Sequence, residues 1–136
     1  KAFPFVRDFF FKIIGLGHEI LIISHKTKYP FIGEKYDLHE AAKKWIEKNL
    51  IKDEFSSFSL DNCFFEPTKD EKVKRIKEMK CDYYIDDLPE ILQNQHFPTN
   101  CQKILFDPES NYEKNNLSNI SIKNSWLQII KEININ

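Results

Sequence analysis

Helix-like and strand-like hydrophobic patterns alternate along the 136-residue chain. Apolar side chains recur at helical spacing in residues 5–14, and a short β-branched run follows at 19–24. Further strand-like runs lie at 63–65, 82–86 and 103–106, with helical patterns between them. Such alternation is typical of parallel strands that are joined by right-handed helical crossovers. The sequence therefore predicts an α/β fold with a parallel sheet.

Local signals predict where three of the helices begin or end. Gly15 and Gly17 indicate the C-terminal end of the first helix, since glycine readily takes the left-handed conformation there. Thr68 and Glu71 have the spacing of a capping box and predict the start of a helix after the second strand. Pro89 is suited to the first turn of a short helix.

The length of the chain favours one domain over residues 1–136. We expect residues 107–119, which are polar, to form a surface loop and residues 120–133 to form a C-terminal amphipathic helix. Residues 28–36 and 52–61 are the candidates for lids over a site, which limits any cap to a small one.

The composition excludes several classes of protein. Lysine and arginine total 20 against 21 aspartate and glutamate residues, so the basic excess typical of proteins that bind a nucleic-acid polymer is absent. With 3 glycines, the chain has neither of the common glycine-rich phosphate-binding motifs. No apolar run has the roughly 18 residues of a membrane span, and no signal-peptide pattern is present.

Cys63, Cys81 and Cys101 are widely spaced and form no Cys-x-x-Cys motif. Their odd number and spacing argue against a disulfide framework and against a zinc site. We therefore expect three free thiols and a cytoplasmic location. The sequence does not indicate an oligomeric state.

Polar side chains suited to phosphate binding follow the first two predicted strands. Ser24, His25 and Lys26 follow the first strand, and Lys69 and Lys72 come shortly after the second. Ligands of parallel sheets bind beyond the carboxyl ends of the strands, so these residues should meet at one rim. A hydroxyl can donate to a phosphoryl oxygen, and a lysine can neutralise its charge.

Structural alternatives remain for these residues. Ser24 could cap a turn, His25 could be a loop side chain, and Lys69 and Lys72 could be solvated surface charges. Both lysines, however, fall in the first turn of a predicted helix, where the helix dipole disfavours a cation. We therefore favour function for the lysines, and we assign Ser24, His25, Lys26 and Lys69 to substrate binding.

Asp86 and Asp87 end the third predicted strand. Paired carboxylates suit Mg²⁺, which takes one or two carboxylates together with waters and substrate phosphate. Asp87 could instead be the N-cap of the helix that contains Pro89. We expect Asp86 and Lys72 to lie at an exposed rim outside the core.

The order and spacing of these segments resemble the haloacid dehalogenase (HAD) superfamily of phosphohydrolases, most closely its deoxyribonucleotidase-like (5'-nucleotidase type C) branch. The resemblance covers roughly residues 5–107. It is carried by Ile22-Ile-Ser24-His-Lys-Thr27, a helix with Trp45, Thr68-Lys-Asp-Glu-Lys72, Tyr84-Ile-Asp-Asp-Leu-Pro-Glu90 and Ile104-Leu-Phe-Asp107. It implies a HAD-like Rossmannoid three-layer sandwich.

The resemblance also implies residue roles and a mechanism. Ser24 matches the hydroxyl that holds the transferring phosphoryl group, and Lys72 matches the phosphate-binding lysine, with Lys69 as the alternative. Asp86 matches a Mg²⁺ ligand, and Asp87 matches its neighbour that orients metal or water. The family transfers the phosphoryl group through an aspartyl-phosphate. The predicted function is a Mg²⁺-dependent phosphatase or nucleotidase that acts on a small phosphorylated metabolite.

The family's first motif, an Asp-x-Asp at the end of the central strand, does not occur near the start of the chain, where Asp8 falls inside a helical pattern. We expect the complete protein to carry this motif and its strand upstream of Lys1, and residues 1–136 alone to be inactive. The alternative is a catalytically inactive HAD-like module that binds a phosphorylated ligand or a protein partner. A receiver-like or flavodoxin-like domain is a weaker alternative, because receiver domains place their acidic pair early and their lysine late.

Overall fold

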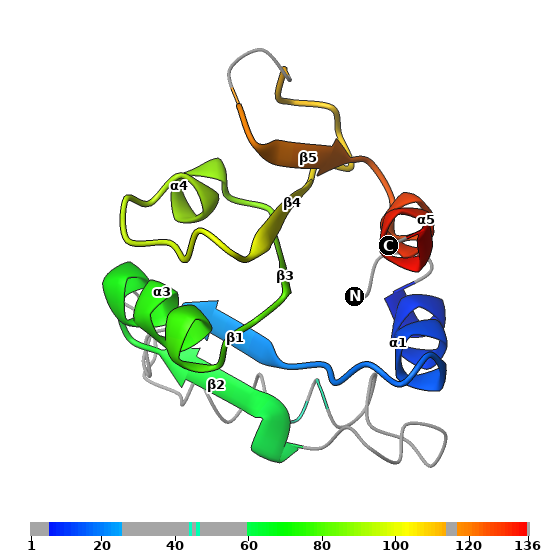
Figure 1. Ribbon diagram of the computed structural model, residues 1–136, viewed down its shortest axis with the longest axis horizontal. Coiled ribbons are helices and arrows are strands. Elements are labelled where there is room, and N and C mark those ends of the chain that lie inside the picture. The colour runs from blue at the N-terminus through cyan, green and yellow to red at the C-terminus, as the bar shows by residue number, and fades with distance from the viewer. Residues whose placement is uncertain (1–5, 26–43, 45, 47–59, 114–116, 136) are drawn as a thin grey trace. The chain divides into compact units, whose positions relative to one another are not determined.

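The computed structural model describes residues 6–25, 44, 46, 60–113 and 117–135 (Figure 1). The chain divides into two compact units, Lys1–Lys72 and Val73–Asn136. Each unit contains helices and a parallel sheet, so the fold is α/β and Rossmann-like, as predicted. The described strands form open sheets and no barrel. The single domain over residues 1–136 stays a prediction.

The first unit contains a two-stranded parallel sheet. Its described elements are α1 (Val6–Gly15), β1 (Ile22–His25), a 3-10 turn η1 (Leu60–Asn62) and β2 (Cys63–Glu66). Strands β1 and β2 pair in parallel, with Ile22 opposite Cys63 and His25 opposite Glu66. The predicted alternation of a helix with apolar strand-like runs is thus confirmed in this unit.

Helix α1 ends where the glycines predict. Gly17 has φ of 91°, and its backbone N–H donates to the carbonyl oxygen of Ile14 at 3.0 Å. The N–H of His18 donates to the carbonyl oxygen of Ile13 at 3.2 Å. These two bonds make a Schellman motif, which satisfies carbonyl groups that the helix end would otherwise leave without partners.

Helix α3 (Lys69–Glu78) contains the boundary between the two units. The side-chain Oγ1 of Thr68 accepts a hydrogen bond from the backbone N–H of Glu71 at 3.1 Å. This contact confirms Thr68 as the N-cap. Val73 and Ile76 are fully buried, so one face of the helix belongs to the core.

The second unit contains a three-stranded parallel sheet in the order β3-β4-β5 (Figure 1). Its strands are β3 (Tyr83–Asp86), β4 (Gln102–Phe106) and β5 (Ile120–Lys123). Its helices are α4 (Pro89–Leu92) and α5 (Trp126–Ile135). The side chains of Ile104 and Leu105 in the central strand point to opposite faces and are both fully buried. Both faces of this sheet are therefore covered.

The C-terminal segment differs from the helix expected over residues 120–133. Residues 120–123 form β5, and the helix begins only at Trp126. The spacing of the apolar residues changes within this segment. Ile120 and Ile122 alternate with polar residues, as in a strand, before the helical spacing starts. No helix or strand occurs in the described part of residues 107–119.

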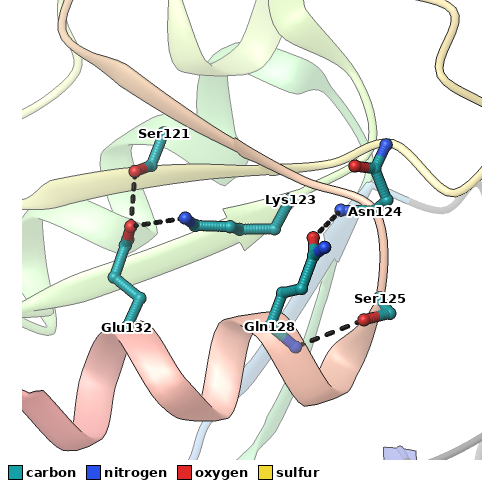
Figure 2. A network of polar contacts seen from close by, with 6 residues as sticks. All are labelled: Ser121, Lys123, Asn124, Ser125, Gln128 and Glu132. Atoms are coloured by element: carbon teal, nitrogen blue, oxygen red, sulfur yellow. Dashed lines mark hydrogen bonds and ion pairs between the residues drawn. The ribbon is translucent and has the colours of Figure 1, made fainter.

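The start of α5 is fixed by a local capping signal. The Oγ atom of Ser125 accepts a hydrogen bond from the backbone N–H of Gln128 at 3.2 Å. In return, the side-chain oxygen of Gln128 accepts from the N–H of Asn124 at 2.7 Å (Figure 2). Ser125 and Gln128 have the spacing of a capping box, which marks a helix start at this position.

Helix α5 is also joined to β5 by polar side chains. Glu132 accepts a hydrogen bond from the hydroxyl of Ser121 at 2.6 Å and pairs with Lys123 at 3.3 Å (Figure 2). The rings of Phe106 and Trp126 pack with centroids 5.0 Å apart. Since Ser121 and Lys123 lie on the same face of β5, these contacts identify the face that α5 covers.

Candidate functional site

The first group of predicted site residues lies at the carboxyl end of β1. Ser24 is half-buried and pairs with Phe65, and His25 is the last residue of the strand, opposite Glu66. The backbone of His25 therefore belongs to the sheet, one residue beyond the expected end of the strand, and its role in substrate binding stays a prediction. Lys26 lies outside the described residues.

The two candidate lysines occupy different environments on α3. Lys69 is the first residue of the helix and is half-buried, whereas the side chain of Lys72 is only 7% exposed. The expectation of an exposed Lys72 is wrong, as is the alternative of a solvated surface charge. The reason is helical spacing, because Lys72 lies one turn before Ile76 on the buried face.

Asp86 and Asp87 follow one another at the carboxyl end of β3, but their side chains differ in burial. Asp86 is 7% exposed and Asp87 is exposed, so the expectation of an exposed Asp86 is also wrong. Successive strand residues point to opposite faces, and Asp86 shares the buried face with Tyr84. The site thus contains one buried carboxylate beside one in solvent.

The turn between β3 and α4 is made by Asp86. Its Oδ1 atom accepts a hydrogen bond from the backbone N–H of Leu88 at 3.0 Å. Leu88 is the N-cap residue of α4, and no side chain caps this helix. The alternative role of Asp87 as an N-cap is therefore wrong.

Tyr84, which was not among the residues predicted from the sequence, lies two residues before Asp86 on the buried face of β3. Its hydroxyl hydrogen bonds with the Asp86 carboxylate. Burial, followed by the negative charge of Asp86, raises the pKa of the Tyr84 phenol far above its ordinary value. The ring packs against Phe97, with centroids 6.0 Å apart. Its position two residues before Asp86 in the same strand places both side chains on one face, and this spacing is visible in the sequence.

Asp107 follows β4 directly, and its carboxylate organises the next loop. Oδ1 accepts the backbone N–H of Asn111 at 2.9 Å, and Oδ2 accepts that of Tyr112 at 3.0 Å. The backbone N–H of Asp107 donates to the carbonyl oxygen of Lys123 at 2.7 Å, which extends the pairing of β4 with β5. Asp107 is 2% exposed and has a structural role.

A polar pocket of about 520 Å³ lies along β5. Lys103, Ser121, Lys123 and Glu132 are among the residues that line it. None of the predicted site residues lines this pocket. Because Lys123 is paired with Glu132, part of its positive charge is already neutralised.

The donor atoms at the end of β3 fit the Mg²⁺ expected from the sequence. No group of three or more His, Cys, Asp or Glu side chains that could hold a metal occurs among the described residues. A Mg²⁺ site in phosphoryl-transfer proteins needs only one or two carboxylates, with water and substrate phosphate as the other ligands. The hard oxygen donors of Asp86 and Asp87 meet that requirement.

The structure places the predicted residues in two groups. Ser24 and His25 lie on β1 of the first unit, together with Lys69 and Lys72 at the start of α3. Asp86 and Asp87 lie at the end of β3 in the second unit. The convergence of both groups on one rim stays a prediction.

The three cysteines are free thiols, as predicted. Cys101 is buried, while Cys63 and Cys81 are half-buried. Burial raises the pKa of Cys63 to about 11 and that of Cys101 to about 12. These thiols are therefore protonated at neutral pH and are inert compared with a reactive cysteine.

Comparison with curated proteins finds a relative in Oceanobacillus iheyensis. The chain is 31% identical over 128 residues to a protein named "Putative nucleotidase OB0422". The alignment includes 93% of this chain but spans 60% of the relative's length. No model of a known protein family matches the chain, and no solved structure matches it significantly.

The longest helices that the structure describes are α1, α3 and α5, with 10 residues each. None of them has both the length and the apolar character required to cross a bilayer.

Proposed function

We propose that the full-length protein is a nucleotide phosphohydrolase of the HAD type. The observation that carries this proposal is the 31% identity to a protein named as a nucleotidase, over 93% of this chain. The buried Asp86 at the carboxyl end of a parallel strand adds support, since ligands of such sheets bind at that end. The substrate class is a small phosphorylated metabolite.

In this proposal Asp86 and Asp87 hold Mg²⁺. When bound, Mg²⁺ would supply positive charge that stabilises the oxygens of the transferring phosphoryl group. The buried Asp86 would provide a fixed anionic ligand, because the N–H of Leu88 already orients its carboxylate. The exposed Asp87 would orient the metal or a water molecule.

The other residues would bind the phosphorylated substrate. The Ser24 hydroxyl would donate to a phosphoryl oxygen, and the ammonium group of Lys72 would offset the charge that develops there. The burial of Lys72 favours it over Lys69, because a charge acts more strongly where water is excluded. His25, Lys26 and Lys69 would contact the rest of the substrate.

The nucleophile in this mechanism is an aspartate, which attacks the phosphorus atom and forms an aspartyl-phosphate. The bond from phosphorus to the leaving oxygen breaks, and that oxygen takes a proton from the acid/base aspartate of the same motif and leaves as an alcohol or nucleoside. Water then hydrolyses this intermediate and releases phosphate. We place the aspartate in an Asp-x-Asp motif of the full-length protein.

The three free thiols support a cytoplasmic location for the protein.

The test compares the full-length protein with Asp86→Asn and Asp82→Asn. Asp82 is an exposed acid just before β3, so its variant removes the same charge away from the site. We expect Mg²⁺-dependent release of phosphate from nucleoside monophosphates or an aryl phosphate, lost in Asp86→Asn and retained in Asp82→Asn. Full activity of Asp86→Asn would refute the assignment of Asp86.

The alternative is a catalytically inactive module that binds a phosphorylated ligand or a protein partner. The sequence observation behind it is that no Asp-x-Asp motif lies near the start of the chain. Binding of nucleoside monophosphates by the full-length protein without any turnover, across Mg²⁺ concentrations, would favour this alternative.

A further inference from the structure

We propose that Tyr84 is a positioning residue that fixes the carboxylate of Asp86 for metal binding. The proposal rests on the proposed function, because it assumes that Asp86 is a metal ligand. Tyr84 is not among the residues that the sequence predicts to bind the metal, to bind the substrate or to act in catalysis.

The placement of Tyr84 follows from the strand itself. Alternate residues of β3 point to the same face, so Tyr84 and Asp86 are neighbours on its buried side. Ile85 lies between them and points to the opposite face. The exposed fraction of Tyr84 is 8%, close to that of Asp86, so both polar groups are removed from water.

Two donors on different parts of the chain hold the Asp86 carboxylate. The backbone N–H of Leu88 donates to Oδ1 at 3.0 Å, and the Tyr84 hydroxyl hydrogen bonds to the same carboxyl group. Burying a polar group is costly unless it is hydrogen-bonded, so these donors offset the cost of burying the carboxyl group. One donor, Tyr84, precedes Asp86 in the sequence and the other, Leu88, follows it. Together they hold the Asp86 carboxylate in a defined orientation.

Tyr84 is itself held by packing. Its ring contacts Phe97 at a centroid distance of 6.0 Å, and Lys103 Nζ lies 5.0 Å from the Phe97 ring centroid. Lys103 also pairs with Tyr84 across β3 and β4. The hydroxyl therefore extends from a ring that the neighbouring strand and Phe97 keep in place, which is how partners beyond the ligands orient a metal site.

A purely packing role for Tyr84 makes a different prediction from a positioning role. Tyr84→Phe keeps the ring and its contact with Phe97 and removes only the hydroxyl. If the ring alone matters, this variant will bind Mg²⁺ as the parent does. If the hydroxyl positions Asp86, Mg²⁺ affinity falls although the fold is unchanged.

The experiment measures Mg²⁺ binding to the full-length protein by isothermal titration calorimetry. We expect Tyr84→Phe to weaken binding about 10- to 100-fold, the usual effect of removing a partner of a metal ligand. Tyr83→Phe is the matched control, since Tyr83 lies on the other face of β3 and should change the affinity less than twofold. Asp86→Asn should abolish binding.

The outcomes separate this inference from the proposed function. If Asp86→Asn abolishes Mg²⁺ binding but Tyr84→Phe binds like the parent, the positioning role is wrong and the metal assignment stands. If Asp86→Asn binds Mg²⁺ normally, the metal assignment itself is wrong. Circular dichroism checks the fold of each variant.

A second variant covers the case in which Tyr84→Phe does not fold. Phe97→Leu keeps the Tyr84 hydroxyl but removes the aromatic ring that supports it. We expect a smaller loss of Mg²⁺ affinity, still greater than that of Tyr83→Phe. Unchanged affinity in Phe97→Leu would overturn the proposal.

Discussion

The Oδ1 atom of Asp86 accepts the backbone N–H of Leu88 at 3.0 Å, at the turn where β3 ends and α4 begins. One side chain thus shapes the turn and also supplies the proposed metal ligand. Its two roles can be separated, because an amide oxygen can accept the same hydrogen bond without carrying a charge.

The first prediction concerns this turn. Asp86→Asn should unfold at nearly the same urea concentration as the parent, because the Leu88 contact is kept. Asp86→Ala should be less stable than Asp86→Asn by about 1–3 kcal/mol, because the N–H of Leu88 loses its acceptor. Equal unfolding midpoints for the two variants would show that this hydrogen bond contributes little.

The second prediction separates the two lysines. Under the proposed function, Lys72→Met in the full-length protein should lower kcat about 100-fold or more, on the scale of one lost stabilising donor. Lys69→Met should raise KM with little change in kcat, because we place Lys69 in substrate binding. Lys74→Met, an exposed position on the same helix, serves as the control. A larger kcat effect at Lys69 than at Lys72 would reverse the assignment.

The third prediction concerns the loop after β4. Asp107→Ala should lower the free energy of unfolding by about 1–3 kcal/mol or more, since the N–H groups of Asn111 and Tyr112 both lose their acceptor. Asp107→Asn should lower the free energy of unfolding by less, because its amide group keeps one oxygen that can accept a hydrogen bond. Glu109→Ala removes a nearby exposed carboxylate and should have little effect in urea unfolding. A stability change as small as that of Glu109→Ala would contradict the role of Asp107.

The fourth prediction is slow alkylation of the folded protein. Burial raises the pKa of Cys63 from its ordinary 9.0 to about 11, which lowers the thiolate fraction about 100-fold at neutral pH. Iodoacetamide at pH 8 should therefore modify Cys63 and Cys101 much more slowly in the native protein than in urea. Mass spectrometry follows each site, and equal rates in both conditions would contradict the burial effect.

The fifth prediction is a loss of stability at alkaline pH. The folded pKa values of Cys63 and Cys101 exceed the ordinary 9.0 of the unfolded chain, so the unfolded state loses these protons first. Their contribution to stability is therefore constant well below pH 9 and falls as the pH rises from about 9 toward 11 or 12. Urea unfolding at a series of pH values measures this decline. Cys63→Ala should reduce its slope, and an unchanged slope would contradict a buried thiol at this position.

The C-terminal end of α1 and the N-terminal start of α3 were predictable from the sequence, because each depends on residues that are close together along the chain. Gly17 takes the left-handed conformation, and Thr68 accepts the N–H of Glu71, whatever the rest of the chain does. Ser125 and Gln128 carry a similar signal for α5. The apolar residues of β5 obscure this signal, because Ile120 and Ile122 also fit a helical pattern that continues into α5.

The sequence by itself determined the alternation of helices and strands, the free thiols and the positions of the polar residues at the strand ends. These features follow from hydrophobic period, residue type and order along the chain. The tertiary structure decided which of these residues are buried. Lys72 and Asp86 lie on faces that pack into the core, while Asp87 remains exposed. The contacts of Asp86 with Tyr84 and of Tyr84 with Phe97 also required the structure, because hydrophobic periodicity does not encode which side chains meet in space.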